Sequence, residues 1–482
     1  MSEILLLQLL WTLVLWFLPL RAIYIFQIFV AGIIFFMSYS LLGDIIDKKS
    51  IFELNNLLFL DSLNGILLLV ITALSFLTSI YSIGYMGREL KNDLPVKKVK
   101  EFYFWMNAFI FVMLTVSLTN NLGILWIAIE GTTLATAFLI SFYRNKEAVE
   151  AGWKYIVLCS LGIALALFGI IILYFTVFHR LGHELQALNW TEIVSIASQL
   201  DPFLLKIAFI FILVGFGTKM GLAPLHFWLP DAHSQAPTPI SALMSGVLLN
   251  CAFYAIIRVE ALLGKAGIGD FGANLLLIFG MFTVFVASIF IIKQFDYKRL
   301  LAYSTMEHMG LIAFAFGINT KLGIFAGIFH LLNHAFVKGL MFFSVGSVLT
   351  NLHTKNIFEI RGLLKIMPFT SVMILIGVFA ITGTPPFSIF ASEFLILTSA
   401  VKSGHIWEAV FVIALLIMIF AGFIYHFSHM LMGEPEKAEK SESITMAIPM
   451  LILILVSISL GLFIPEKINL LLNQVEHILK QG

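Results

Sequence analysis

The sequence predicts an all-α polytopic membrane protein, from its composition and from a row of apolar segments. Of the 482 residues, 60% are hydrophobic and 12% are charged, and the mean hydropathy is +1.00. Soluble domains are about a quarter charged, so a bilayer is the expected solvent. A helix needs about 20 apolar residues to cross the hydrocarbon core. We expect about fourteen transmembrane helices, at residues 3–20, 22–43, 57–83, 101–119, 121–142, 152–178, 203–229, 238–261, 271–292, 299–318, 322–350, 369–401, 407–431 and 443–464.

Charged residues between these spans predict the orientation, because cytoplasmic loops are enriched in Lys and Arg. Seventeen such cations fall on one side: Arg21, Arg88, Lys91, Lys97, Lys98, Lys100, Arg144, Lys146, Lys154, Lys293, Lys298, Arg299, Lys355, Arg361, Lys365, Lys437 and Lys440. Eight fall on the other: Lys48, Lys49, Arg180, Lys265, Lys321, Lys402, Lys467 and Lys480. The first group is expected in the cytoplasm, with both termini outside and the first segment retained.

Several function classes are excluded by their motifs or composition being absent from the sequence. A net charge of +1 gives no sign of a nucleic-acid partner. Cys159 and Cys251 are the two cysteines, too few for an iron–sulfur cluster, and no C-x-x-C-H haem signature is present. Walker A and G-x-G-x-x-G nucleotide motifs are also missing. We therefore expect no metal or cofactor site in this chain.

Proline interrupts two expected spans, and a charged residue lies beside each interruption. The span at 203–229 contains Lys219 and continues into GLAPLHFWLPDAHSQAPTP, and the span at 369–401 contains TGTPPFS followed by Glu393. Proline breaks a helix, and a membrane tolerates the break only where protein or internal water satisfies the freed groups. Paired breaks are typical of ion pathways in inverted-repeat transporters. Two ordinary kinks in a structural bundle are the alternative.

The two breaks predict two inverted five-helix repeats, spans four to eight and spans nine to thirteen. This division aligns the broken spans, which are the two discontinuous helices, and places Glu130 opposite Glu307 and His308. The resulting segments are 1–100, 101–261, 271–431 and 443–482.

Ionisable residues at membrane depth are the candidate functional residues, because a charge at a helix centre costs about 2.5–3.5 kcal/mol on insertion scales. Glu130 and Lys219 lie well inside their apolar stretches. Snorkelling towards a span end is the simpler interpretation for Lys206 and Arg258. The other candidates are Glu307, His308, His330, His334, Lys338, Glu393, His426 and His429.

Two arrangements of these residues predict proton transfer. His330, His334 and Lys338 recur every four positions, so they form one stripe along about two helical turns. One buried histidine is usually a satisfied core residue, but three titratable groups in register favour a proton track, because histidine titrates near neutral pH. Glu130 and Lys219 would act as a switch, since a nearby carboxylate favours protonated Lys219 and its withdrawal favours release of the proton.

Several motifs resemble one family of membrane proteins, from about residue 50 onward. These motifs are WLPDAHSQAPTPISALMSGVLL with the preceding GTK, HLLNHAFVKGLMF, AYSTMEHMG and the TPPFS–SEF segment. They resemble the antiporter-like, proton-translocating membrane subunits shared by respiratory complex I, Mrp-type cation/proton antiporters and membrane-bound NiFe hydrogenases. EHMG, EGTTLATAFLIS and EAGWKYIVL are most similar to component F of hydrogenase-4 and its counterpart in formate hydrogenlyase complexes.

The resemblance implies a role for individual residues. The relay residues would be Glu130, Lys219, His330, His334, Lys338 and Glu393, with His226, Glu307, His308 and Asn250 as additional candidates. Cytoplasmic proton entry near Lys219, passage along span eleven and exit past Glu393 are implied. Two departures stand out. Asn250 occupies the position of a central lysine in many members, and LLNQVEHILK is a short tail where distal members have a long lateral helix.

Three functional hypotheses follow. The first is a proton-translocating subunit, not catalytic by itself, of a redox-driven complex of hydrogenase or NADH dehydrogenase type in a prokaryotic cell membrane. Its NiFe centre and Fe–S clusters would be on partner subunits in a peripheral arm. The second is a subunit of a secondary Na⁺/H⁺ antiporter without a redox partner. The third is a structural or small-solute transport role. The expected partners are other membrane subunits, lipid and protons, with Na⁺ left open.

Overall fold

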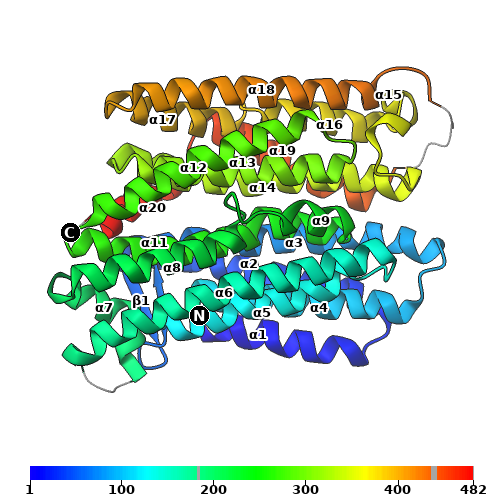
Figure 1. The fold of residues 1–482 in the computed structure, drawn as a ribbon. Helices are drawn as coiled ribbons and strands as arrows, with labels where there is room; N and C mark the ends of the chain where they lie inside the picture. The colour runs from blue at the N-terminus through cyan, green and yellow to red at the C-terminus, as the bar shows by residue number, and fades with distance from the viewer. Residues whose placement is uncertain (182–184, 436–441, 481–482) are drawn as a thin grey trace.

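Helices make up almost all of the structure, a computed structural model that describes residues 1–181, 185–435 and 442–480. Figure 1 shows one bundle of long, roughly parallel helices, with the N-terminal helices at one side, α16–α18 at the other and α14 between them. The first half contains α1 (Ser2–Val14), α2 (Leu20–Lys48), β1 (Ser50–Glu53), β2 (Leu58–Asp61), α3 (Ser62–Lys91), α4 (Val96–Leu118), α5 (Leu122–Ile140), α6 (Lys146–Leu181), α7 (Trp190–Ile196), α8 (Pro202–Met220), α9 (Trp228–Gln235), α10 (Thr238–Leu243) and α11 (Leu249–Lys265).

The second half contains α12 (Gly269–Ile292), α13 (Tyr297–Gly317), α14 (Lys321–Leu352), α15 (Leu363–Ile366), α16 (Pro368–Ile381), α17 (Ser388–Lys402), α18 (Ile406–Leu431), α19 (Ile444–Leu462) and α20 (Glu466–Lys480). Short helical turns lie between the longer elements: η1 (Leu15–Phe17), η2 (Leu185–Leu188), η3 (Ala197–Gln199), η4 (Met244–Leu248) and η5 (Ile357–Glu359). The turn η4 is π-helical and joins α10 to α11 in one continuous segment.

Eleven helices in the described part of the chain are long and apolar enough to cross a membrane. They are α2, α3, α4, α5, α6, α8, the segment from α10 to α11, α12, α14, α18 and α19. Large apolar side chains such as Phe138, Leu161 and Ile417 are exposed on the outside of the bundle, where lipid rather than water is the favourable neighbour. The chain is a multi-pass membrane protein, as its composition predicts.

The antiparallel hairpin β1–β2 is not predicted from the sequence. Residues 54–56 take positive φ and turn the chain, and Asp61 then ends β2. The Asp61 carboxylate caps α3 by accepting the N–H groups of Leu63 and Asn64. The helix expected at 57–83 therefore begins at Ser62, because an aspartate cap fixes its first turn.

The chain leaves helical geometry at both predicted proline sites. Residues 221–227 separate α8 from α9, and residues 382–387 separate α16 from α17. Gly221, the first residue of one segment, and Gly383, the second residue of the other, have φ of 84° and 65°, values that a residue without a Cβ atom adopts freely. Each break lies beside a candidate relay residue.

Four cations of the predicted charge asymmetry lie outside the residues whose side chains are described: Arg180, Lys437, Lys440 and Lys480. Most of the other cations lie in loops or near helix ends. Lys298, in the first turn of α13, differs from them because it is completely buried. The orientation of the chain stays a prediction.

Candidate functional site

Lys219 lies at the C-terminal end of α8, just before the first break, and is fully buried. Its Nζ donates to Thr133 Oγ1 of α5 at 2.8 Å and to Tyr155 OH of α6 at 2.5 Å. The same atom lies 4.5 Å from the centre of the Tyr155 ring. Such partners are needed because an unpaired amine in hydrocarbon is strongly disfavoured. Lys219 is thus held by neutral hydroxyls rather than by a carboxylate.

Glu130 reaches Lys219 through one intervening hydroxyl. Thr133 Oγ1 donates to Glu130 Oε2 at 3.1 Å while accepting from Lys219, and Ser160 Oγ donates to Glu130 Oε1 at 2.7 Å. The predicted pair is therefore bridged rather than direct. Thr133 was detectable in principle, because a residue three positions after Glu130 shares its helix face. Tyr155 and Ser160 lie on α6, and nothing in the local sequence predicts that they contact Lys219 and Glu130.

A second cluster is built where α13 packs on α14. His308 Nδ1 lies 3.0 Å from His330 Nε2, and the ring centroids of His308 and His334 are 4.9 Å apart. Glu307 Oε2 lies 3.5 Å from His308 Nε2, without a hydrogen bond between them. All four side chains are buried. One histidine of α13 thus lies between two histidines of α14.

The second cluster continues in both directions along α14. His330 Nδ1 lies 2.9 Å from Ser392 Oγ of α17. At the other end, Lys338 Nζ donates to the Leu301 carbonyl of α13 at 3.0 Å. The stripe predicted from the four-residue spacing therefore faces α13 and reaches the second broken helix.

Glu393 follows Ser392 on α17 and is almost completely buried. A Cβ atom on Gly383 would overlap the Glu393 carboxylate, so the break lets this side chain lie against the backbone. Ligand atoms of His308, His330 and Glu393 all lie within 4.8 Å of one another. Three such donors could hold a metal ion, and the same closeness suits short proton transfers. The expected lack of a metal stays a prediction.

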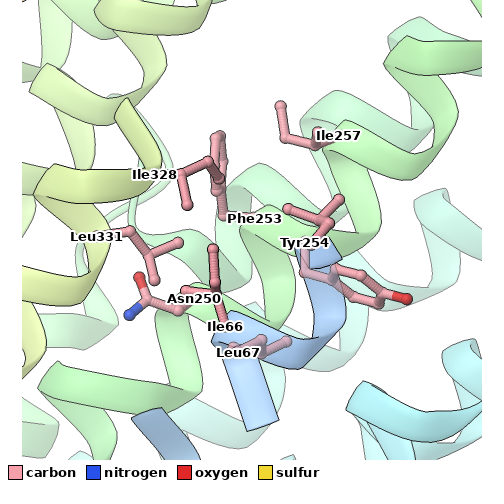
Figure 2. A pocket seen from close by; sticks show the side chains of 9 residues that line it. Ile66, Leu67, Asn250, Phe253, Tyr254, Ile257, Ile328 and Leu331 are labelled. Carbon is pink, nitrogen blue, oxygen red and sulfur yellow. The ribbon is translucent and has the colours of Figure 1, made fainter. Parts of the chain in front are cut away.

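Asn250 lies on α11, two residues after η4. Its Nδ2 donates to the Gly246 carbonyl at 2.8 Å, while Oδ1 has no hydrogen-bond partner among the described residues. Figure 2 shows Asn250 beside a cavity of about 10 Å³ lined mainly by apolar side chains. That volume holds one water at most. Asn250 therefore supplies a polar atom, but no titratable group, at this position.

The Lys219 cluster consists of Lys219, Glu130, Thr133, Tyr155 and Ser160, and the histidine cluster consists of Glu307, His308, His330, His334, Lys338 and Glu393. Both lie close to the same span, but they are not joined. The segment from α10 to α11 touches both, because α11 packs on α8 and the Ser245 carbonyl lies 3.3 Å from His334 Nε2. In the part of the chain that the structure describes, no hydrogen bond links the Lys219 cluster to the histidine cluster. Coupling between them therefore needs an electrostatic effect, bridging water or movement.

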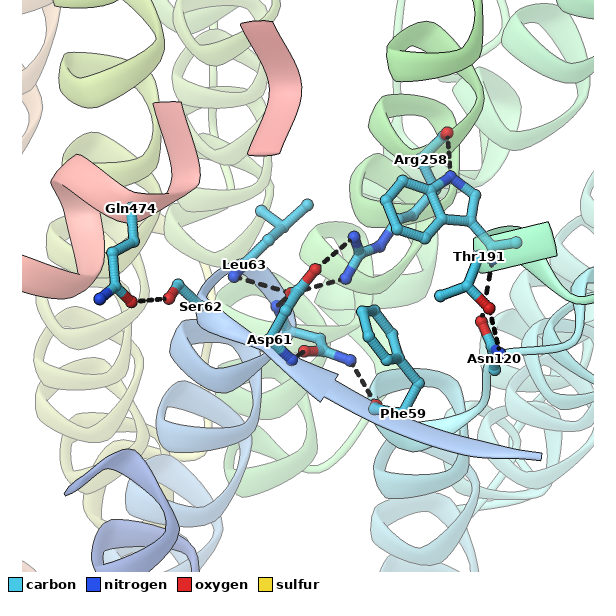
Figure 3. Close-up of polar contacts among 10 residues, drawn as sticks. Phe59, Asp61, Ser62, Leu63, Asn120, Thr191, Arg258 and Gln474 are labelled. Atoms are coloured by element: carbon cyan, nitrogen blue, oxygen red, sulfur yellow. Dashed lines mark hydrogen bonds and ion pairs between the residues drawn. The ribbon is translucent and has the colours of Figure 1, made fainter. Parts of the chain in front are cut away.

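Contrary to the sequence prediction, Arg258 does not extend towards a span end, because its side chain is buried and only 1% exposed. Both terminal nitrogens of its guanidinium donate to the Asp61 carboxylate at 2.7 Å (Figure 3). The guanidinium also lies 4.3 Å from the Trp190 ring. The hairpin β1–β2 brings Asp61 to α11, which the sequence spacing could not reveal. Lys206, by contrast, is half-buried with its Nζ 5.4 Å from the Phe271 ring.

Two histidines lie at the first break. His226, an additional relay candidate, is buried with its ring 4.7 Å from that of Phe227, and its Nδ1 has no hydrogen-bond partner among the described residues. His233 on α9 is completely buried, and both of its ring nitrogens are without such partners. His233 is not among the residues predicted from the sequence, although it follows His226 in the same LHFWLPDAH stretch.

Two family descriptions match this chain. Residues 119–418 match "NADH:quinone oxidoreductase/Mrp antiporter, TM", and residues 50–92 match "NADH-Ubiquinone oxidoreductase (complex I), chain 5 N-terminus". The first match alone spans more than half of the chain. The chain belongs to this family. All predicted relay residues, from Glu130 to Glu393, fall within the range 119–418.

Individual relatives extend the family match over most of the chain. The chain is 38% identical over 409 residues to the hydrogenase-4 component F homolog of Methylacidiphilum infernorum, covering 85% of this chain and 86% of that one. A chain of the membrane-bound sulfane sulfur reductase, an archaeal respiratory membrane complex, superposes with a TM-score of 0.85 at 25% identity, covering 99% and 97%. A chain of the Mrp complex from Dietzia sp. DQ12-45-1b gives 0.85 at 19%, covering 100% and 98%.

The superposition on the Mrp chain, at 19% identity, shows the fold alone. The family match and the hydrogenase-4 component F homolog also show the class of subunit. This protein is an antiporter-like membrane subunit of the kind found in complex I, hydrogenase-type and Mrp complexes. The resemblance seen in the motifs is thereby confirmed.

Proposed function

We propose that this antiporter-like subunit moves protons across a prokaryotic cell membrane as part of a redox-driven complex. The single observation that carries the proposal is the contact of His308 with His330, next to Ser392 and Glu393 at a broken helix. Titratable groups from three helices lie within one short transfer of each other inside the bilayer. Ionisable groups at this depth are costly, and those that face one another inside a bundle are a mark of ion pathways.

The Lys219 cluster supplies the switch of this proposal. Because Thr133 joins Glu130 to Lys219, a small displacement of α5 or α8 breaks the bridge without separating a tight ion pair. Protonated Lys219 is favoured when the carboxylate is near and disfavoured when it withdraws. The changed charge then biases the histidine cluster, where His334, Lys338, Glu307 and Glu393 hold and pass protons.

The proposed topology has fourteen spans. In addition to the eleven apolar helices, three further elements span the membrane in this scheme: α1 with η1, α13, and the broken pair α16–α17. Segments 101–261 and 271–431 form the two inverted repeats, flanked by 1–100 and 443–482. The broken pairs α8–α9 and α16–α17 are equivalent in this scheme, and both termini lie outside. The shared pattern of a positive-φ glycine at each break supports the repeat.

The proposed complex contains further membrane subunits and a peripheral arm. The relative named as a hydrogenase-4 component F homolog and the archaeal respiratory complex support a redox partner. A NiFe centre and Fe–S clusters would then reside on partner subunits, with hydrogenase or NADH dehydrogenase chemistry driving translocation.

One experiment tests this function directly. The native complex is isolated through an affinity tag on this chain, and its nickel and iron contents are measured. Everted membrane vesicles are then supplied with hydrogen or NADH, and acidification of their lumen is followed with an acridine dye. We expect metal-bearing partner chains and acidification that requires Lys219. A complex without redox metals, or acidification unchanged in Lys219→Met, contradicts the proposal.

A secondary Na⁺/H⁺ antiporter is the second candidate, because the chain superposes on a Mrp subunit as well as on a respiratory one. The same vesicles discriminate between the two. When a pH gradient is imposed without a redox substrate, an antiporter dissipates it on addition of NaCl. The redox-driven subunit leaves the gradient unchanged.

A further inference from the structure

A cavity of about 730 Å³ lies between η1, α4 and α5, far from the proton relay, and its wall is largely aromatic. Trp105 of α4 is stacked on Phe138 of α5 with ring centroids 4.2 Å apart, and Trp16 of η1 meets Phe104 edge to face at 5.9 Å. Phe138 is 55% exposed, so the cavity opens to the outside of the bundle. Tryptophan is enriched where lipid meets water. The cavity therefore extends inward from the membrane surface at which α4 begins and α5 ends.

The mouth of this cavity is positively charged. Lys98 in the first turn of α4 and Arg144 between α5 and α6 both line it. They share one carboxylate, since Glu101 Oε2 lies 2.9 Å from Lys98 Nζ and 3.9 Å from Arg144 Nη2. A third cation stands at the same wall, because Lys100 Nζ lies 3.5 Å from the backbone carbonyl of Trp16. Three cations are thus set against one carboxylate, which leaves room for an anion.

The start of α4 also has the wrong charge for a helix N-terminus. Its first turn contains Lys97 and Lys98 and no acidic residue, although the helix dipole favours anions and disfavours cations at this end. Cationic loops are ordinary on one side of a membrane protein, but their side chains extend into water. The Lys98 side chain is 19% exposed and lines the cavity instead. A bound anion would offset both the dipole and the excess of cations.

We propose that this cavity binds one anionic phospholipid, with its phosphate between Lys98 and Arg144 and an acyl chain along the wall formed by Trp105 and Phe138. Clusters of Lys and Arg beside transmembrane helices recognise anionic headgroups. A free phosphate ion would leave the apolar wall uncovered, and a zwitterionic lipid brings its own cation to a site that already has three. The proposal concerns lipid binding alone, so it does not depend on the proposed function.

The test uses the complete complex, purified in detergent, and a phosphatidylglycerol that carries a photoactivatable diazirine in one acyl chain. After illumination, mass spectrometry of the peptides locates the labelled residues. We expect label on α4 around Trp105 and on α5 around Phe138, and unlabelled phosphatidylglycerol should displace it. Phosphatidylcholine at the same concentration and millimolar inorganic phosphate should not displace it.

Substitutions at the mouth test the role of charge. In Lys98→Gln and in Arg144→Gln, the lipid concentration that gives half-maximal labelling should rise about fivefold, the value of one cation near a membrane surface. The Arg144 side chain is 71% exposed, so its replacement leaves the packing intact. Lys98→Arg keeps the charge and should label as wild type. Lys293→Gln, at an exposed position after α12, is the matched control and should also label as wild type.

Each alternative occupant predicts a different result. Displacement by phosphatidylcholine as readily as by phosphatidylglycerol indicates an ordinary boundary lipid, and displacement by phosphate indicates a site for a free anion. Absence of label from both helices indicates that a neighbouring subunit fills the cavity. Any of these results, or half-maximal labelling unchanged in both Lys98→Gln and Arg144→Gln, overturns the proposal. Labelling is measured without an electron donor, so such a failure leaves the proposed proton translocation untouched.

Discussion

Arg258 and Lys219 are both buried cations of this bundle, but they are held in opposite ways. Arg258 makes two contacts of 2.7 Å with Asp61 and is boxed by aromatic rings. Lys219 touches hydroxyls, and its carboxylate lies one hydroxyl away. Arg258, which we assign a structural role, is thus paired directly with its carboxylate. Lys219, which we propose transfers protons, is close to a carboxylate without contacting it directly.

The comparison also assigns the two regions to different tasks. The Asp61–Arg258 pair joins the cap of α3 to α11 and fixes the hairpin at one end of the bundle. The Lys219 cluster joins α5, α6 and α8 beside a helix break. Substitutions should therefore affect stability in the first region and proton movement in the second.

The largest expected effect is on stability, in Asp61→Ala. This change leaves the Arg258 charge buried and unpaired, which costs about 3–5 kcal/mol. We expect a lower thermal midpoint and less assembled protein in detergent extracts. The double variant Asp61→Leu with Arg258→Met should recover much of the loss, because it removes both charges. A single variant as stable as wild type would refute the structural role.

Lys219→Met should abolish acidification of the vesicle lumen while leaving the amount of assembled complex unchanged. Methionine fills a similar volume but carries no proton. Lys206→Met is the matched control on the same helix, since Lys206 is half-buried beside the Phe271 ring. Equal losses in both variants would show that the effect is not specific to the cluster.

Thr133→Val should have a smaller effect on acidification, a decrease of about threefold, which is the range of one neutral hydrogen bond. Valine keeps the shape but removes the hydroxyl that bridges Glu130 and Lys219. Thr133→Ser retains the hydroxyl and should behave as wild type. The rate of dye quenching at saturating electron donor measures both. Identical rates in Val and Ser variants would mean that the bridge is not used.

Much of the fold is predictable from the sequence, because local signals determine it. Apolar length predicts the spans, and glycine and proline predict the breaks beside Lys219 and Glu393. The four-residue spacing on α14 predicts the stripe. The bridge through Thr133 and the partner of Arg258 depend on long-range packing. Asp61 is 197 residues from Arg258 in the chain, and no periodicity connects positions that far apart.

The most direct test of the central claim is the number of protons moved per electron in reconstituted complexes carrying His308→Leu. The matched control is His426→Leu, which removes another buried histidine whose Nε2 lies 3.1 Å from the Ile291 carbonyl. We predict a lower ratio in His308→Leu and a wild-type ratio in His426→Leu, with electron transfer continuing in both. A wild-type ratio in His308→Leu would contradict the account, because the histidine cluster would then be inert.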